Sequence, residues 1–127
     1  MRAFREAVES GDMDAAVALL SEDVVFTSPV VHKPYRGKPI TAAILRAVAQ
    51  VFQGLSYQRE LTDGPDHALI FTARVGDREL TGCDFIHVDE SGRIDELMVM
   101  VRPLSAAQAL QVAMEAKFAE IAADAAR

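Results

Sequence analysis

The sequence predicts an α+β fold in which a curved, mostly antiparallel sheet wraps around N-terminal helices and is followed by a C-terminal helix. Apolar residues recur at helical spacing in the first part of the chain, up to Phe52, and again after Pro103. Between these segments, residues 67–102 alternate in polarity and are interrupted by short turns, which is typical of antiparallel hairpins. Helices packed across the concave face of such a sheet would form a cone with an apolar mouth.

The composition fits one globular domain over residues 1–127, since 50% of the residues are hydrophobic and 25% are charged. The net charge of -6 argues against binding to nucleic acid or to an anionic membrane surface. The N-terminal segment lacks the apolar core of a signal peptide and no apolar run is long enough to cross a membrane, so a cytoplasmic location is expected. The single cysteine, Cys83, excludes an internal disulfide. No spacing of His and Cys indicates a metal site, and neither a metal nor a cofactor is expected.

The N-terminal helices are predicted from short amphipathic segments. Residues 2–10 form the first helix, and Gly11 ends it. Asp12 can cap a second helix, in which apolar residues recur at helical spacing as far as Leu20. A third helix begins at Pro39, which suits the first helical turn, and carries a continuous apolar stripe.

A strand and a loop lie between the second and third helices. Residues 24–28 are β-branched and aromatic and predict a strand, which Pro29 ends. Residues 29–38 form the only long irregular stretch of the chain. Because loops held by a rigid scaffold often carry function, the residues of this loop are candidates for a site.

The remaining strands are predicted to place Asp84 on an apolar face of the sheet. They cover residues 55–62, 67–75, 78–88 and 93–102. A turn at Gly76-Asp77 pairs Leu69 with Asp84. The next turn, over residues 89–92, pairs Asp84 with Leu97. Since side chains alternate along a strand, Asp84 then shares one face with apolar residues of all three last strands. These residues are Leu69, Phe71, Leu80, Ile86, Leu97 and Val99.

A carboxyl group on an apolar face has two interpretations. Removing a lone carboxylate from water is costly, so burial raises the pKa of Asp84 and favours the neutral acid. A neutral acid at neutral pH can donate a hydrogen bond to a ligand. Alternatively, Asp84 accepts hydrogen bonds from a Tyr, Ser or His and only stabilises the core.

The opposite face of the last strands is also apolar. It carries Cys83, Phe85, Met98 and Met100. An exposed apolar patch of this kind usually marks a partner surface. We expect the partner to be a second copy of the chain in an isologous homodimer.

This order of elements resembles the NTF2-like superfamily and, more narrowly, its SnoaL-like and ketosteroid isomerase branch. The motifs that carry the resemblance are GDMDAAVALLSEDVVFTSPV near the N-terminus, Tyr35-Arg36-Gly37 before the third helix, and Asp84 followed by Ser91-Gly92. The resemblance covers nearly the whole chain. The resemblance implies an NTF2-like cone that binds a small apolar molecule. It also implies a homodimer, since members of this family often pair through the outer face of the sheet. Because functions vary widely within this fold, it does not specify a reaction.

Carried over residue by residue, the resemblance to ketosteroid isomerases is incomplete. The position of their general base, immediately before a proline on the first strand, holds Ser28, and a neutral hydroxyl is no unassisted base near pH 7. The position of their oxyanion-binding tyrosine in the first helix holds Phe4. Only the protonated acid of the oxyanion hole has a match, which is Asp84. Steroid isomerase activity by that set of residues is therefore not expected.

Three hypotheses for function remain. The first is a SnoaL-like protein of undetermined activity that binds a small apolar ligand in the cone. The second is an acid–base enzyme of the isomerase, cyclase or hydrolase type, in which Asp84 donates a proton and His32 of the loop accepts one. The third is a non-catalytic, dimerising accessory domain. The expected ligand-lining residues are Phe26, Ser28, Tyr35, Phe52, Phe71, Leu97 and Val99. A cavity that reaches Asp84 favours ligand binding, whereas a cone filled by its phenylalanines favours a structural role.

Overall fold

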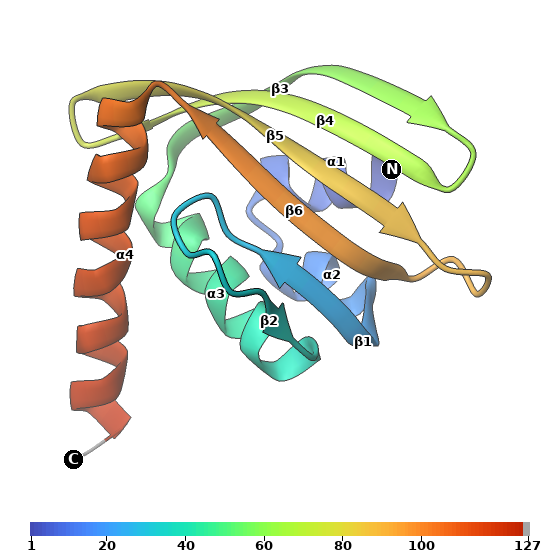
Figure 1. Cartoon of the computed structure of the whole chain (residues 1–127), viewed down its shortest axis with the longest axis horizontal. Coiled ribbons are helices and arrows are strands. Elements are labelled where there is room, and N and C mark those ends of the chain that lie inside the picture. The colour runs from blue at the N-terminus through green and yellow to red at the C-terminus, as the bar shows by residue number, and fades with distance from the viewer. Residues whose placement is uncertain (126–127) are drawn as a thin grey trace.

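The computed structural model describes residues 1–125 and has the predicted α+β architecture (Figure 1). The helices are α1 (Arg2–Ser10), α2 (Met13–Ala18), α3 (Lys38–Val51) and α4 (Leu104–Ala125). The strands are β1 (Leu20–Thr27), β2 (Tyr35–Arg36), β3 (Gln53–Asp63), β4 (Asp66–Val75), β5 (Arg78–Val88) and β6 (Ile94–Arg102). Figure 1 shows the curved sheet arching over α1, α2 and α3, with α4 upright at the left of the view. No helix within residues 1–125 is long and apolar enough to cross a membrane.

The sheet has the strand order β2-β1-β6-β5-β4-β3 and is antiparallel except between β1 and β6. The parallel pairing of β1 with β6 places Leu20 beside Ile94 and Phe26 beside Leu97. It joins the first strand of the chain to the last, so both ends of the sequence contribute to one inner face. The predicted curved, mostly antiparallel sheet is thereby confirmed.

The register of β5 confirms one predicted pairing and corrects the other. Leu69 of β4 is paired with Asp84, as predicted. On β6, however, Asp84 is paired with Val99, and Leu97 is paired with Ile86. The observed pairing of β5 with β6 differs from the predicted one by two residues. One residue comes from the turn, which extends to Arg93, whose carbonyl accepts the Asp89 N–H. The other comes from the register shift between His87 and Val88. A shift of two residues preserves the face of every side chain, so Asp84 still points inward.

The N-terminal boundaries follow the local sequence, with two corrections. Gly11 adopts a φ of 77° and ends α1, while Asp12 Oδ1 accepts the Ala15 N–H at the start of α2. The second helix ends at Ala18 rather than at Leu20, because Leu20 is fully buried and begins β1. Residues 35–36 of the predicted loop form β2, which pairs with β1.

Candidate functional site

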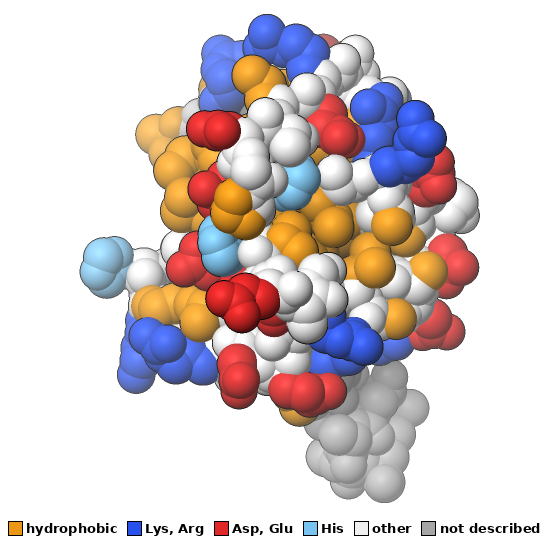
Figure 2. All heavy atoms as spheres, turned by 90° about the vertical axis from the view of Figure 1, so that its right-hand side faces the viewer, with side chains coloured by type: hydrophobic (Ala, Val, Ile, Leu, Met, Phe, Trp, Pro, Cys, Tyr) orange, Lys and Arg blue, Asp and Glu red, His pale blue; other side chains and the backbone are white. Residues whose placement is uncertain are grey.

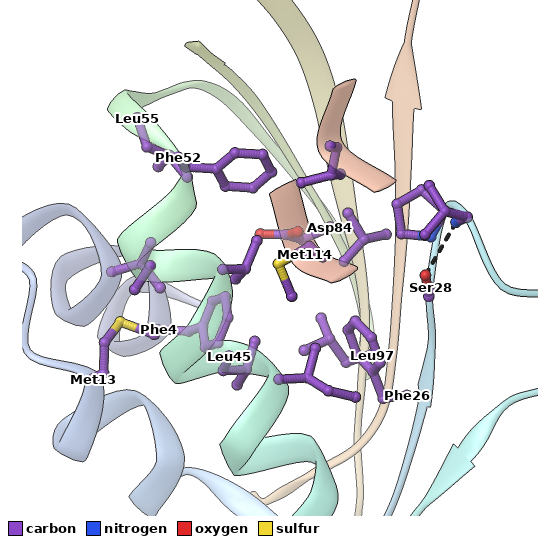
Figure 3. Close-up of a pocket in the computed structure, with 18 of the residues that line it drawn as sticks. Phe4, Met13, Phe26, Ser28, Leu45, Phe52, Leu55, Asp84, Leu97 and Met114 are labelled. Atoms are coloured by element: carbon purple, nitrogen blue, oxygen red, sulfur yellow. Dashed lines mark hydrogen bonds between the residues drawn. The ribbon is translucent and has the colours of Figure 1, made fainter. Parts of the chain in front are cut away.

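A cavity of about 540 Å³ lies inside the cone. This volume is within the range of roughly 300–1,000 Å³ that is usual for small-molecule sites. Its walls are mostly apolar and come from all four helices and from the sheet (Figure 3). They include Phe4, Phe26, Phe52, Leu97, Met114 and Phe118. The aromatic side chains therefore form walls of the cone without filling it.

Asp84 lies on β5 and lines this cavity with only 7% of its surface exposed. Figure 3 shows its carboxyl group among apolar side chains, close to Met114. Burial raises the pKa of Asp84 to about 7, and the hydrogen bond from Tyr57 acts in the opposite direction. At neutral pH the group is consequently divided between the neutral acid and the carboxylate.

The two oxygens of Asp84 have different surroundings. Oδ2 accepts a hydrogen bond from the Tyr57 hydroxyl at 2.6 Å. Within residues 1–125, this hydroxyl is the one hydrogen-bond partner of the carboxyl group, and no buried side-chain oxygen or nitrogen is left without a partner. Oδ1 is therefore accessible, and since Asp84 lines the cavity, this oxygen faces it.

Tyr57 comes from the middle of β3 and reaches across β4 to Asp84. Its ring packs edge-on against Phe71, with centroids 5.9 Å apart. Phe71 in turn lies against Gly82, where a Cβ atom would overlap the phenylalanine ring. Burial, followed by the charge on Asp84, raises the pKa of Tyr57 far above its ordinary value, so Tyr57 remains a neutral hydrogen-bond donor.

This arrangement can present one strong donor inside an apolar cavity. When Asp84 is neutral, one of its oxygens accepts from Tyr57 and the other can donate to a ligand. The hydrogen bond from Tyr57 polarises the neutral acid, and this strengthens the hydrogen bond that Asp84 can donate to a ligand. The other carboxylates that line the cavity are Glu115, which is exposed on α4, and Glu9, which accepts the Tyr57 N–H.

Most of the sequence-predicted lining residues do line the cavity. They are Phe26, Ser28, Tyr35, Phe52, Leu97 and Val99. Phe71 is an exception, because it is 1% exposed and packs behind Tyr57 and Phe52 rather than at the cavity surface.

The structure does not bring His32 to Asp84, contrary to the expectation. His32 is exposed and is not among the residues that line the cavity. The reason is local: Ser28 Oγ accepts the N–H groups of Val30 and Val31 and turns the chain at the end of β1 (Figure 3). Val30 and Val31 face the cavity in place of the histidine.

Tyr57 is a residue of the candidate site that no local sequence pattern indicates. A tyrosine was among the expected partners of Asp84, and the chain contains only two tyrosines. The contact between Tyr57 and Asp84 could nevertheless not be predicted, because β4 separates β3 from β5 and the pairing of β3 is irregular on both sides of Tyr57. Strand alternation alone does not predict a contact across an intervening strand.

Comparisons with known proteins agree with this architecture. The family model described as SnoaL-like domain matches residues 1–97. A steroid delta-isomerase from Pseudomonas aeruginosa is 43% identical with a TM-score of 0.89, over 93% of this chain and 88% of that chain. An uncharacterized protein with a cystatin-like fold from Silicibacter pomeroyi is 38% identical with a TM-score of 0.87, over 91% and 82% of the two chains.

More distant similarities concern the fold alone. A putative ketosteroid isomerase from Kribbella flavida is 24% identical with a TM-score of 0.67, over 80% of this chain and 74% of that chain. A search of curated proteins found no match. The family match covers most of the chain, and the resemblance predicted from its motifs is confirmed. The chain belongs to the SnoaL-like domain family, within the NTF2-like fold.

Proposed function

We propose that this protein binds a small apolar molecule in the cone cavity through a single carbonyl oxygen. In this proposal the neutral form of Asp84 donates the hydrogen bond, and Tyr57 holds the acid in place. The observation that carries the proposal is a buried carboxyl group with one oxygen bound to Tyr57 and the other facing an apolar cavity of about 540 Å³.

A carbonyl oxygen is the ligand group that matches these surroundings. A neutral acid needs an acceptor, and a ketone or enone provides one at little desolvation cost. A charged ligand would have to leave water for walls that are mostly apolar, which is unfavourable without a paired charge. The apolar remainder of the ligand would contact aromatic and aliphatic walls, which favours rigid hydrocarbon rings over flexible polar molecules.

Isomerisation of an unsaturated ketosteroid is the second candidate function. It is favoured by the 43% identity to a protein described as a steroid delta-isomerase. A donor at Asp84 would suit the enolate oxygen of such a reaction. The position expected for the base holds Ser28, whose Oγ already accepts two backbone N–H groups, and His32 lies outside the cavity. We therefore expect ketone binding to be the main activity and turnover to be slow or absent.

The test is the pH dependence of binding for matched ligands. Rigid polycyclic ketones, including an unsaturated ketosteroid, are compared with hydrocarbons of the same shape by calorimetry between pH 5 and pH 9. Since the pKa of Asp84 is about 7, ketone affinity is expected to fall about tenfold per pH unit above that value. Asp84→Asn keeps a donor and removes the ionisation, so it is expected to bind ketones without this dependence.

Two results would contradict the proposal. One is equal affinity for ketones and hydrocarbons in the wild-type protein, and the other is a ketone affinity that does not change with pH. His32→Ala is the control and is expected to behave as wild type, because His32 does not line the cavity. Migration of the ketosteroid double bond that is lost in Asp84→Leu and retained in His32→Ala would instead favour the isomerase.

A further inference from the structure

The backbone of Tyr57 is held from outside the sheet by two side chains of α1. Arg5 Nη2 donates to the Tyr57 carbonyl oxygen at 3.2 Å, and the Tyr57 N–H donates to Glu9 Oε2 at 3.1 Å. Arg5 Nε also donates to Glu9 Oε1 at 3.3 Å, which ties the two side chains together. The pair offers one donor and one acceptor to a single residue, as a neighbouring strand would.

Tyr57 needs such support because of its place in the sheet. β3 is an edge strand, so the outward N–H and carbonyl groups of Tyr57 have no strand partner. The register of β3 against β4 shifts between Gln53 and Ser56 and again between Tyr57 and Arg59. Irregular pairing on both sides leaves the position of this residue weakly specified by the sheet itself.

We infer that Arg5 and Glu9 are positioning residues, which hold the Tyr57 hydroxyl on Asp84 and thereby set how readily Asp84 gives up its proton. The chain of contacts runs from α1 to the β3 backbone, through the Tyr57 ring, to the cavity carboxyl group. The inference itself does not depend on ligand binding. Only its consequence, a change in the pH range over which a ketone is bound, rests on the proposed function.

A purely structural role for the pair is the competing interpretation. The helix α1 has another anchor on β3, where the Met1 amino group lies 3.3 Å from Glu60 Oε2. The helix also contains a second Arg–Glu pair at the same spacing, Arg2 and Glu6, which is 3.9 Å apart and mostly exposed. Within residues 1–125 that pair has the same charges but forms no hydrogen bond or ion pair with a strand, so it is a matched control.

Direct charge effects must be separated from positioning. The groups that act on Tyr57 are Asp84 from β5 and Glu9 and Arg5 from α1, while Cys83 is the titratable neighbour of Asp84 in the chain. Removing Glu9 alone deletes a negative charge, which by itself would lower the pKa of Asp84. Loss of the Tyr57 hydrogen bond would raise that pKa, because this bond lowers it. Positioning and charge therefore act in opposite directions in Glu9→Leu.

The experiment measures the pKa of Asp84 by carboxyl carbon NMR in the full chain without ligand. Tyr57→Phe supplies the reference and is expected to raise this pKa by about one unit or more. The double variant Arg5→Met/Glu9→Leu removes both charges together and is expected to raise it by about half a unit or more. Glu9→Gln keeps an acceptor for the Tyr57 N–H but deletes the charge, so the pKa of Asp84 is expected to stay at or slightly below the wild-type value. The control Arg2→Met/Glu6→Leu is expected to match wild type.

An unchanged Asp84 pKa in a destabilised Arg5→Met/Glu9→Leu protein would overturn the inference and leave the pair a structural anchor. An equal rise in the Arg2→Met/Glu6→Leu control would overturn it as well. If the double variant does not fold, the comparison of Glu9→Leu with Glu9→Gln decides, because both lose the charge and only Glu9→Leu loses the acceptor. A higher Asp84 pKa in Glu9→Leu than in Glu9→Gln supports positioning, and an equal or lower one contradicts it. Because no ligand is present, failure of ketone binding would contradict the proposed function without affecting this test.

Discussion

At the scale of single residues, Asp84 links the stability of the protein to pH. Its pKa of about 7 in the folded protein lies above the ordinary value of 3.8, so the folded state retains a proton that the unfolded chain releases between these values. The stability conferred by the neutral acid is fully present below pH 3.8 and is lost as pH rises through 7. The total loss is about 4 kcal/mol.

Asp84→Asn is expected to lack this loss. The difference in free energy of unfolding between wild type and Asp84→Asn, followed in urea from pH 4 to pH 8, should therefore change by several kcal/mol in favour of the variant as pH rises. Other titrating groups contribute equally to both proteins and cancel in the difference. Parallel curves for the two proteins would show that Asp84 ionises freely in the folded state.

At the scale of elements, the contact between β4 and β5 at Phe71 and Gly82 supports the site from behind. Gly82→Ala adds a Cβ atom that overlaps the Phe71 ring, so the ring and the Tyr57 side chain against it must move. We expect a loss of about 1–3 kcal/mol in the free energy of unfolding, as for overpacking in a dense core. Thr81→Ala, on the opposite face of β5, is the control and is expected to cost less than about 0.5 kcal/mol. A stable Gly82→Ala protein with an unchanged Asp84 pKa would contradict this account.

At the scale of the whole molecule, the outer face of β4, β5 and β6 has an apolar centre and charged ends. The centre contains Cys83, Phe85, Met98 and Met100. Asp66 and Glu96 lie toward one end, on either side of His87, and Arg74 and Arg102 lie toward the other, where Glu79 is paired with Arg74. Two copies related by a two-fold axis that lies in the interface and crosses the strands would place the basic end of one over the acidic end of the other. Figure 2 shows, on one side of the molecule, hydrophobic side chains gathered between acidic and basic ones.

We therefore expect a homodimer in solution, with twice the mass of one chain by light scattering. Met100, which is 52% exposed, would be buried in this interface, so Met100→Glu is expected to give a monomer. Val112→Glu, at a position of α4 that is 67% exposed, is the control and should remain dimeric. A monomeric wild-type protein at micromolar concentration would contradict the proposed interface.

Much of the fold and part of the site could be predicted from local signals. The turn at Gly76-Asp77 and the alternation of β5 were sufficient to place Asp84 on the inner face, and an error of two residues at the next turn did not move it to the other face. The position of His32 could not be predicted, because it depends on how Ser28 turns the chain after β1. A loop has no periodicity that would indicate which of its side chains point inward.

The sequence by itself determined the order of the elements, the α+β class, the apolar inner face and the presence of a carboxyl group on that face. These properties follow from spacing along the chain, since helices and strands have fixed periods. Only the tertiary structure decided that Tyr57 bonds to Asp84, that α1 holds Tyr57, and that a cavity remains open inside the cone. Those contacts join residues that are 27 to 52 positions apart, and they depend on strand irregularities and on packed volumes, which no local pattern specifies.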